Sequence, residues 1–324
     1  MGEFDLIDRY FKQPAAQRPG VDLGIGDDCA LLRPGPGMQL AISSDMLVEG
    51  RHFLSTVSPA HLAHKALAVN LSDLAACGAR PLGFTLAMAL PRVDEPWLAA
   101  FSRGLFALAD AHACPLIGGD TTQGPLNLCI TVFGEVPVGQ ALLRRGAQPG
   151  DEVYISGTVG DARLALEVFR GHLALPGEAF AQVRQRMEQP SPRVALGQAL
   201  RGVASAAADV SDGLLGDLGH ILKASAVGVD IDTSFAINSI ATSDHLKRAG
   251  AGICLEYALA GGDDYELVFT APPQAHAAVA GASQHSQTPV TRIGRITAEP
   301  GVRLWDAQGQ RLHRQFASFD HFVS

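Results

Sequence analysis

The sequence predicts an α+β protein of mixed helix and strand content that is divided into two domains. Short apolar runs of strand length alternate with longer runs in which apolar residues repeat at helical spacing. This order occurs in both halves of the 324 residues, and it places helices against sheets. A polar, basic and glycine-bearing stretch at 139–150 separates the halves. We therefore predict an N-terminal domain at 1–138, a linker at 139–150 and a C-terminal domain at 151–324.

In the N-terminal half, an apolar strand at 40–42 is expected to end at the polar residues 43–45. A helix opens at Pro59, because the apolar residues after it recur every three to four positions. The other expected elements are a strand at 83–90, a helix at 97–111, a strand at 115–117 broken by two glycines, and a strand at 128–136.

In the C-terminal half, an alanine-rich strand at 206–210 is expected to deliver Ser211 and Asp212 into a helix that starts near Leu214. The other expected elements are a strand at 152–155, a glycine turn, a helix from Ala162, a strand at 265–269 and a hairpin at 304–312.

Composition and charge exclude several classes of protein. Hydrophobic residues make up 47% and charged residues 18% of the chain, which favours a well-buried core over disorder. The net charge of −8 argues against nucleic-acid binding. The five cysteines are widely spaced without a CxxC pair, which is typical of a reducing compartment. Without a signal peptide or an apolar run of membrane-spanning length, we expect a cytoplasmic protein with no membrane partner.

Carboxylates and hydroxyls beside glycine stand where several apolar runs stop. The segments are Gly26-Asp27-Asp28, Ser43-Ser44-Asp45, Ile117-Gly118-Gly119-Asp120 and Val210-Ser211-Asp212-Gly213, with Asp73 in the helix after Pro59. Hard oxygen ligands of this kind suit magnesium, which proteins use to hold polyphosphate. Two carboxylates about 5 Å apart repel each other by roughly 3 kcal/mol at an effective dielectric near 20, and a cation removes that repulsion. The pattern indicates phosphate chemistry on several metal ions.

Each segment taken alone also has an ordinary structural explanation. Asp27 and Asp28 suit a simple turn, Ser43 suits a helix or strand cap, and Ser211 suits a helix N-cap as well as a phosphate site. Asp73 favours function, because it lies on an apolar helix face. The P-loop and the protein-kinase motifs are absent from the sequence.

Several longer motifs occur together and in a specific order. They are Gly24 to Ala30 (GIGDDCA), Ser43-Ser44-Asp45, Lys65 to Gly78 (KALAVNLSDLAACG), Ile117 to Thr122 (IGGDTT), Val210 to Leu214 (VSDGL) and Gly261 to Leu267 (GGDDYEL). On these motifs the chain resembles the thiamine-monophosphate kinases, over nearly its full length. The resemblance implies transfer of the ATP γ-phosphoryl group to thiamine monophosphate, with several Mg²⁺ ions. It also implies the two-domain fold of aminoimidazole-ribonucleotide synthetase and a homodimer formed through N-terminal-domain strands.

The resemblance also assigns roles to individual positions. The implied magnesium ligands are Asp28, Ser43, Ser44, Asp45, Asp73, Asp120, Asp209 and Asp212. The implied ATP contacts are Gly119, Asp120, Arg144 and Ser211, and the implied thiamine phosphate contacts are His52, Asp263 and Phe319. Relatives often carry Glu at the position of Asp263 and Tyr or Trp at that of Phe319. Arg145 is the alternative to Arg144 as the phosphate contact, His52 suits a loop cap as well as a phosphate, and Phe319 also suits an apolar C-terminal cluster.

The implied acceptor is a phosphate monoester that is largely dianionic at neutral pH, so it is already a nucleophile and no general base is required. We expect direct in-line transfer without a phosphoenzyme. Two alternatives stay open: another ATP-using enzyme of the same superfamily, acting on an amide or on selenide, and a non-catalytic metal or thiamine-phosphate binding protein.

Overall fold

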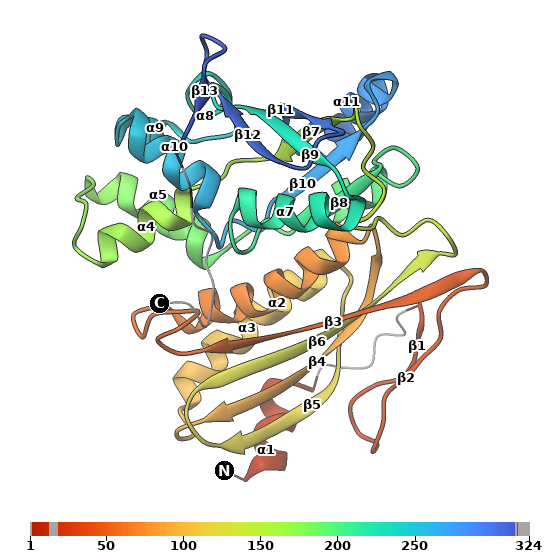
Figure 1. The fold of residues 1–324 in the computed structure, drawn as a ribbon. Coiled ribbons are helices and arrows are strands. Elements are labelled where there is room, and N and C mark those ends of the chain that lie inside the picture. Colours follow the sequence, from red (N-terminus) through yellow and green to blue (C-terminus); the bar gives the residue numbers. More distant parts are fainter. Residues whose placement is uncertain (1, 13–18, 315, 317–324) are drawn as a thin grey trace. The chain divides into compact units, whose positions relative to one another are not determined.

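The computed structural model describes residues 2–12, 19–314 and 316, and the side chains of Glu3 and Phe4 lie outside that description. The chain folds into two compact units. Unit 1 comprises Met1–Leu74 with Ala79–Gly139, and unit 2 comprises Ala75–Gly78 with Gln140–Ser324. Both units combine helices with sheets (Figure 1), so the predicted mixed α+β class is confirmed.

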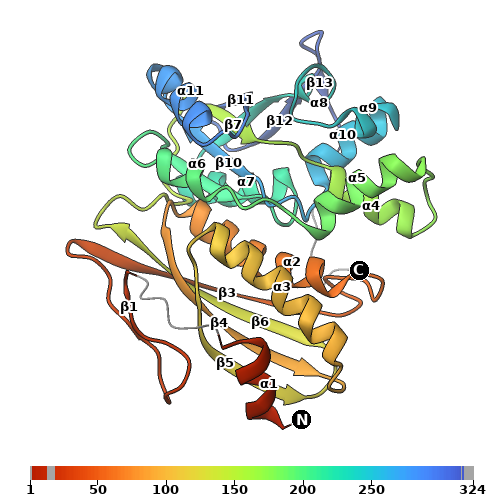
Figure 2. The same ribbon diagram turned by 180° about the vertical axis from the view of Figure 1, so that it is seen from behind.

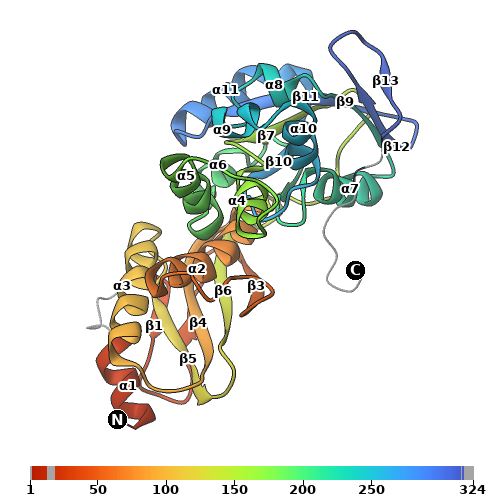
Figure 3. The same ribbon diagram turned by 90° about the vertical axis from the view of Figure 1, so that its left-hand side faces the viewer.

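Unit 1 is built around a sheet whose described strands run in the order β3-β6-β4-β5. The pairs β3–β6 and β6–β4 are antiparallel, and β4 and β5 are parallel. Helices α2 and α3 cover one face of this sheet, as Figures 2 and 3 show. The elements of unit 1 are α1 (Glu3–Tyr10), β1 (Val21–Leu23), β2 (Leu31–Leu32), β3 (Met38–Val48), α2 (Pro59–Ala76), β4 (Arg80–Leu90), α3 (Glu95–Ala111), β5 (Leu116–Gln123) and β6 (Asn127–Pro137).

The two faces of this sheet differ in burial. On the helix-covered face, Leu71 of α2, Phe84 of β4 and Phe101 of α3 are completely buried. On the opposite face, β3 exposes a row of side chains, because alternate residues of a strand point to opposite sides. Leu40, Ile42, Met46 and Val48 of this row are 45%, 59%, 55% and 38% exposed. We call the uncovered side the open face.

Two predicted strand ends in unit 1 are wrong. β3 continues through Ser43-Ser44-Asp45, and β5 continues through Gly118-Gly119, so these polar groups lie inside strands. Gly119 has a packing reason: a Cβ there would lie 1.9 Å from the carbonyl oxygen of Leu86, and its φ is +150°. The expected helices and the strands at 83–90 and 128–136 are confirmed as α2, α3, β4 and β6.

Unit 2 contains a sheet whose described strands run in the order β13-β12-β9-β11-β7-β10-β8. Neighbours are antiparallel except β12 and β9. The strands are β7 (Glu152–Ser156), β8 (Ala206–Asp209), β9 (Gly228–Asp232), β10 (Leu267–Ala271), β11 (Val290–Thr297), β12 (Gly301–Trp305) and β13 (Arg311–Leu312). The helices are α4 (Asp161–Phe169), α5 (Gly177–Glu188), α6 (Val194–Ala199), α7 (Leu214–Ser225), α8 (Phe235–Asn238), α9 (Asp244–Arg248), α10 (Ala251–Ala260) and α11 (His276–His285), with a short 3₁₀ turn η1 (Pro273–Ala275).

The sequence predicted the main elements of unit 2. β7, α4, β8, α7 and the β12–β13 hairpin occur where they were expected. The strand expected at 265–269 begins two residues later, because Tyr265 has a left-handed backbone with φ +52° and cannot continue a strand. Throughout the described part of the chain, each helix is too short or too polar to span a membrane.

Candidate active site

In unit 1, strand β3 and helix α2 bring three of the predicted metal ligands together. Ser43 and Asp45 point from β3 toward the helix-covered face, and the Ser43 hydroxyl donates to the Asp73 carboxylate of α2. Asn70, completely buried one turn earlier on α2, accepts from the Asp45 amide at 3.1 Å and donates to the Ala66 carbonyl at 2.9 Å. Asn70 therefore fixes the strand against the helix, a role that the sequence analysis did not assign.

The electrostatics of this cluster favour a cation. Burial and the nearby Asp73 carboxylate together raise the pKa of Asp45 to about 6. The donor set of two carboxylates and one hydroxyl fits magnesium, which is bound through one or two carboxylates and otherwise keeps water or substrate phosphate. Among the described residues, no three His, Cys, Asp or Glu side chains are grouped closely enough to hold a metal ion. Unit 1 thus offers a two-carboxylate site and not a complete protein cage.

Ser44 and Asp120 lie elsewhere on the sheet of unit 1. Ser44 points to the open face, where its hydroxyl donates to the Ile130 carbonyl at 3.1 Å and lies 3.0 Å from the Thr131 hydroxyl. Asp120 pairs with Ala87 and shares that face from β5, at the edge opposite β3. Three strand spacings separate the two edges, which is about 14 Å. One copy of the sheet therefore does not bring Asp120 to Asp45.

Asp28 and His52 occupy loops of unit 1. Asp28 is exposed in the connection between β1 and β2, where its amide donates to the Asp27 carboxylate at 3.0 Å, as in a simple turn. His52 follows β3, and its Nδ1 accepts from the Val48 amide at 3.0 Å. This bond is the loop-capping role that the sequence left open for His52.

In unit 2, two turns that are distant in sequence lie side by side at one end of β8 and β10. The Asp263 amide donates to the Ser211 carbonyl at 2.7 Å, and the Tyr265 amide donates to the Val210 carbonyl at 2.8 Å. Asp209, which ends β8 and is 7% exposed, pairs with Leu267 of β10. The predicted ligands Asp209, Ser211, Asp212 and the predicted substrate contact Asp263 therefore share one edge of this unit.

The start of α7 is already occupied by a side chain of the chain itself. Asp217 Oδ2 accepts from the amides of Ser211, Asp212 and Gly213 at 3.0, 3.0 and 3.2 Å. Burial and the Asp212 charge nevertheless outweigh these bonds and raise the pKa of Asp217 to about 7. Phosphate binding by these amides, one of the two sequence interpretations, would first require Asp217 to leave. The only sequence signal was a carboxylate in the first turn of the helix.

Of the two remaining predicted contacts, the structure describes Arg144, and its backbone lies apart from these turns. The Arg144 carbonyl accepts from the Ser225 hydroxyl at 3.3 Å, at the last residue of α7. The Ser211–Asp212 turn precedes the other end of this 12-residue helix, about 18 Å away along its axis. The backbone of Arg144 is therefore not at that turn. Phe319 lies outside the described residues.

Comparisons with known proteins agree with both the fold and the motifs. Residues 26–136 match the family described as AIR synthase related protein, N-terminal domain, and residues 148–307 match AIR synthase related protein, C-terminal domain. The chain is 47% identical to the thiamine-monophosphate kinase of Salmonella typhimurium (strain LT2) over 325 residues, covering 100% of this chain and 99% of the relative. Identity to that of Escherichia coli (strain K12) is also 47%, over 324 residues with coverage of 100% and 99%.

Solved structures give the same result. The thiamine-monophosphate kinase from Stenotrophomonas maltophilia K279a superposes with a TM-score of 0.83 at 46% identity, covering 89% of this chain and 92% of that one. AaThiL complexed with AMPPCP and TMP gives a TM-score of 0.76 at 26% identity, covering 95% and 93%. The predicted two-domain architecture is confirmed. The chain belongs to the AIR synthase related protein family and, within it, to the thiamine-monophosphate kinases.

Proposed function

We propose that this kinase transfers the γ-phosphoryl group of ATP directly to the phosphate of thiamine monophosphate, in line and with magnesium, to give thiamine diphosphate and ADP. The observation that carries the proposal is the 47% identity to thiamine-monophosphate kinases along the whole chain. The complex of AaThiL with AMPPCP and TMP supports simultaneous binding of a nucleotide and a phosphate-bearing acceptor at such a fold.

The chemistry needs positioning and charge neutralisation more than proton transfer. The acceptor phosphate has a second pKa near 6, so at neutral pH it attacks as a dianion without a base. Two polyanions must nevertheless approach each other. Magnesium, when bound, would supply the positive charge that lets phosphate oxygens enter an acidic site. Ser43, Asp45 and Asp73 would hold it in unit 1, and Asp209 and Asp212 would hold it in unit 2.

The remaining roles follow the same scheme. Asp28, Ser44 and Asp120 are proposed as further metal ligands, and Gly119, Asp120, Arg144 and Ser211 as ATP contacts. His52, Asp263 and Phe319 are proposed to contact the thiamine phosphate. We also propose 1–138 as the ATP- and magnesium-binding domain, 139–150 as the linker and 151–324 as the C-terminal domain. Cytoplasmic location stays a prediction from the sequence.

A homodimer formed through the open face of unit 1 belongs to the same proposal. This face exposes the apolar row of β3, and β3 is an edge strand of the sheet. Monomeric proteins rarely leave such a surface uncovered. Because Ser44 and Asp120 share the open face at opposite edges, a second copy that places its β5 over β3 of the first would bring its Asp120 toward Ser44. Such pairing would supply ligands that a single copy leaves apart.

The dimer is tested by sedimentation of Ile42→Asp and Met46→Asp, with Val93→Asp as the matched control. Val93 is exposed by 49% on the loop before α3, outside the open face. We expect the two β3 variants to sediment as monomers with little activity and the control as an active dimer. Dimeric β3 variants would refute the proposed interface.

The reaction is tested by measuring ADP and thiamine diphosphate together, with and without thiamine monophosphate and magnesium. We expect both products in equal amounts, and only when all components are present. ADP release that does not depend on thiamine monophosphate would contradict the proposed acceptor. Radiolabelled phosphate trapped on the protein during turnover would contradict direct transfer.

A further inference from the structure

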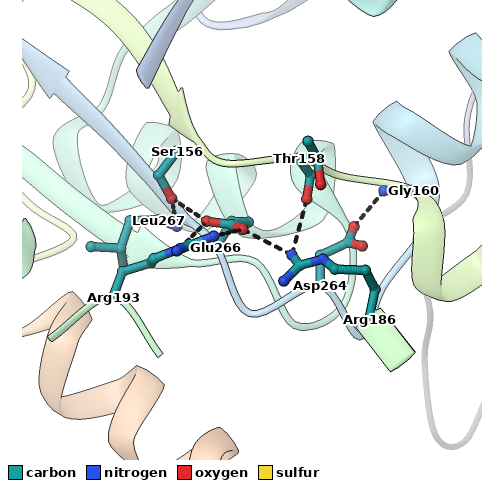
Figure 4. A network of polar contacts seen from close by, with 8 residues as sticks. All are labelled: Ser156, Thr158, Gly160, Arg186, Arg193, Asp264, Glu266 and Leu267. Carbon is teal, nitrogen blue, oxygen red and sulfur yellow. Dashed lines mark hydrogen bonds and ion pairs between the residues drawn. The ribbon is translucent and has the colours of Figure 1, made fainter. Parts of the chain in front are cut away.

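A buried carboxylate stands directly after the Asp263 turn in unit 2. Glu266 is completely buried, and both of its oxygens are bound (Figure 4). Arg193 donates from Nε to Oε2 at 2.6 Å and from Nη2 to Oε1 at 2.5 Å. Arg186 of α5 donates to Oε1 at 2.9 Å, and the Ser156 hydroxyl at the end of β7 donates to Oε2 at 2.6 Å. Three separate elements thus converge on one side chain.

Net stability does not explain such a cluster. Removing charges from water costs several kcal/mol per ion, and apolar residues of the same volume are often equally stable. A buried ion pair does, however, restrict the backbone to the one conformation in which all of its bonds form. The segment next to Glu266 has a backbone that needs such restriction.

The segment from Gly261 to Tyr265 holds a strained conformation. Asp263 and Tyr265 have φ values of +72° and +52°, in the left-handed region that costs non-glycine residues about 1–2 kcal/mol each. Such strain persists only where the surroundings impose it. Asp264 between them is buried, and its Oδ2 accepts from the Gly160 amide at 2.8 Å. Asp264 and Glu266 are therefore anchors on either side of the strained Tyr265.

The same network reaches the second functional turn. The Val210 amide donates to the Glu266 carbonyl at 2.8 Å, and the Asp263 and Tyr265 amides return to the carbonyls of Ser211 and Val210. Movement of Glu266 would therefore displace both turns. The Glu266 carboxylate is closely packed against the backbone, because a Cβ on Gly157 would lie 2.1 Å from Glu266 Oε1.

From this geometry we propose that Glu266, held by Arg186 and Arg193, is a positioning residue that shapes the Asp263 turn for the thiamine phosphate. The proposal rests on the proposed function. Glu266 has no oxygen left for a ligand, so it acts through Asp263. The Asp263 turn is joined to Glu266 through the chain itself, whereas the Ser211 turn is joined to it only through backbone hydrogen bonds. Binding of the acceptor therefore depends on Glu266 more than binding of ATP does.

The test is the KM of each substrate for Glu266→Gln and Arg193→Lys, measured well below the unfolding temperature of each variant. Arg193→Lys keeps the charge but loses the paired bonds, so it decides the question if Glu266→Gln does not fold. The matched control is Glu152→Gln: Glu152 is held by Arg292 at 2.7 Å and by Tyr154 at 2.6 Å at the other end of β7. Its removal weakens the same sheet without touching the Asp263 turn.

We expect the KM for thiamine monophosphate to rise about tenfold in both network variants, with a smaller change in the KM for ATP. The control should keep both values. Adding Glu266→Gln to Asp263→Asn should raise the KM no further than Asp263→Asn alone, because both act at one contact. Unchanged KM values, or equal increases for both substrates, would overturn the inference. A wild-type protein without acceptor-dependent ADP release would instead overturn the proposed function.

Discussion

Two acidic side chains, Asp45 in unit 1 and Glu266 in unit 2, have opposite surroundings. In unit 1, the carboxylate of Asp45 faces that of Asp73, and burial together with this repulsion raises its pKa. In unit 2, Glu266 faces two arginines and a serine hydroxyl. A carboxylate opposite another carboxylate gains from an added cation, whereas one already paired with arginine cannot ligate a metal without breaking its bonds. The neighbours, and not the residue type, separate a candidate ligand from a structural anchor.

The largest expected effect follows from neutralising the unit 1 pair. Asp45→Asn should lower kcat by roughly 10²–10³, because several kcal/mol of charge stabilisation depend on the metal site. Without magnesium, the same change should raise the unfolding temperature, because it removes the repulsion from Asp73. Steady-state kinetics and thermal unfolding in EDTA measure the two effects.

The control for this variant is Asp8→Asn, which removes an exposed carboxylate on α1 that pairs with Lys12 at 3.0 Å. It should leave both kcat and the metal-free unfolding temperature nearly unchanged. If Asp45→Asn keeps the wild-type kcat at saturating magnesium, Asp45 is not a metal ligand.

The second prediction concerns the anchor in unit 2. Gly157→Ala should lower the free energy of unfolding by roughly 2–4 kcal/mol, because the new methyl group overlaps Glu266 and the backbone is left-handed with φ +52°. Gly171→Ala is the matched control, since Gly171 has φ +74° and open space around its Cβ position. The control should cost about 1 kcal/mol, the strain alone. Equal losses of unfolding free energy for the two variants, measured in urea, would show that the Glu266 side chain moves aside at little cost.

A third prediction compares the response of both regions to magnesium. At a hundredfold excess over its dissociation constant, the ion should stabilise the wild-type protein by about 2.7 kcal/mol. Asp45→Asn and Asp73→Asn should lose most of this gain, and Arg193→Lys should keep it. Thermal shift titrations without nucleotide measure the difference. Loss of the response in Arg193→Lys as well would mean that the two regions are not separate in function.

The sequence predicted those parts that depend on local periodicity. α2 was expected from its apolar spacing, and α7 from the strand that delivers Ser211 and Asp212 into a helix start. The Asp73 carboxylate was singled out because it lies on an apolar helix face. The direction of Ser44, opposite to Ser43 and Asp45, could not be predicted while β3 was expected to end before them. The face of the sheet to which a strand residue points is known only when the structure shows which side a helix covers.

Long-range partners were also beyond local patterns. Glu266 is paired with Arg186 and Arg193, which lie 80 and 73 positions away in the sequence. Neither arginine stands in a sequence motif that would identify it as the partner of Glu266. Asp217 was missed for another reason: its carboxylate binds the amides that precede its own helix, and Ser211 had been considered the cap. In both cases tertiary structure selects one of several residues of the same type.

The smallest expected effect tests whether the neighbouring side chains alone, and not the unit, decide if a carboxylate acts as an anchor. Glu135 lies in unit 1, yet it resembles Glu266, because it accepts from Arg80 Nε at 3.1 Å and from the Gly35 amide at 2.9 Å. Burial alone would raise its pKa, but these bonds outweigh burial and the pKa is lowered. Glu135→Gln should therefore cost about 1–2 kcal/mol at neutral pH.

The sign of the pH dependence makes this test specific. A lowered pKa means that Glu135 stabilises the fold above its ordinary pKa of 4.5 and that this contribution is lost as the pH falls through the lower, folded value. The wild-type and Glu135→Gln proteins should therefore differ in urea midpoint at pH 7, and the difference should shrink as the pH falls below 4.5. A difference in urea midpoint that stays constant over this pH range would mean that Glu135 stabilises the fold through packing and not through its charge. A shrinking difference would show that an arginine partner makes a carboxylate an anchor in either unit.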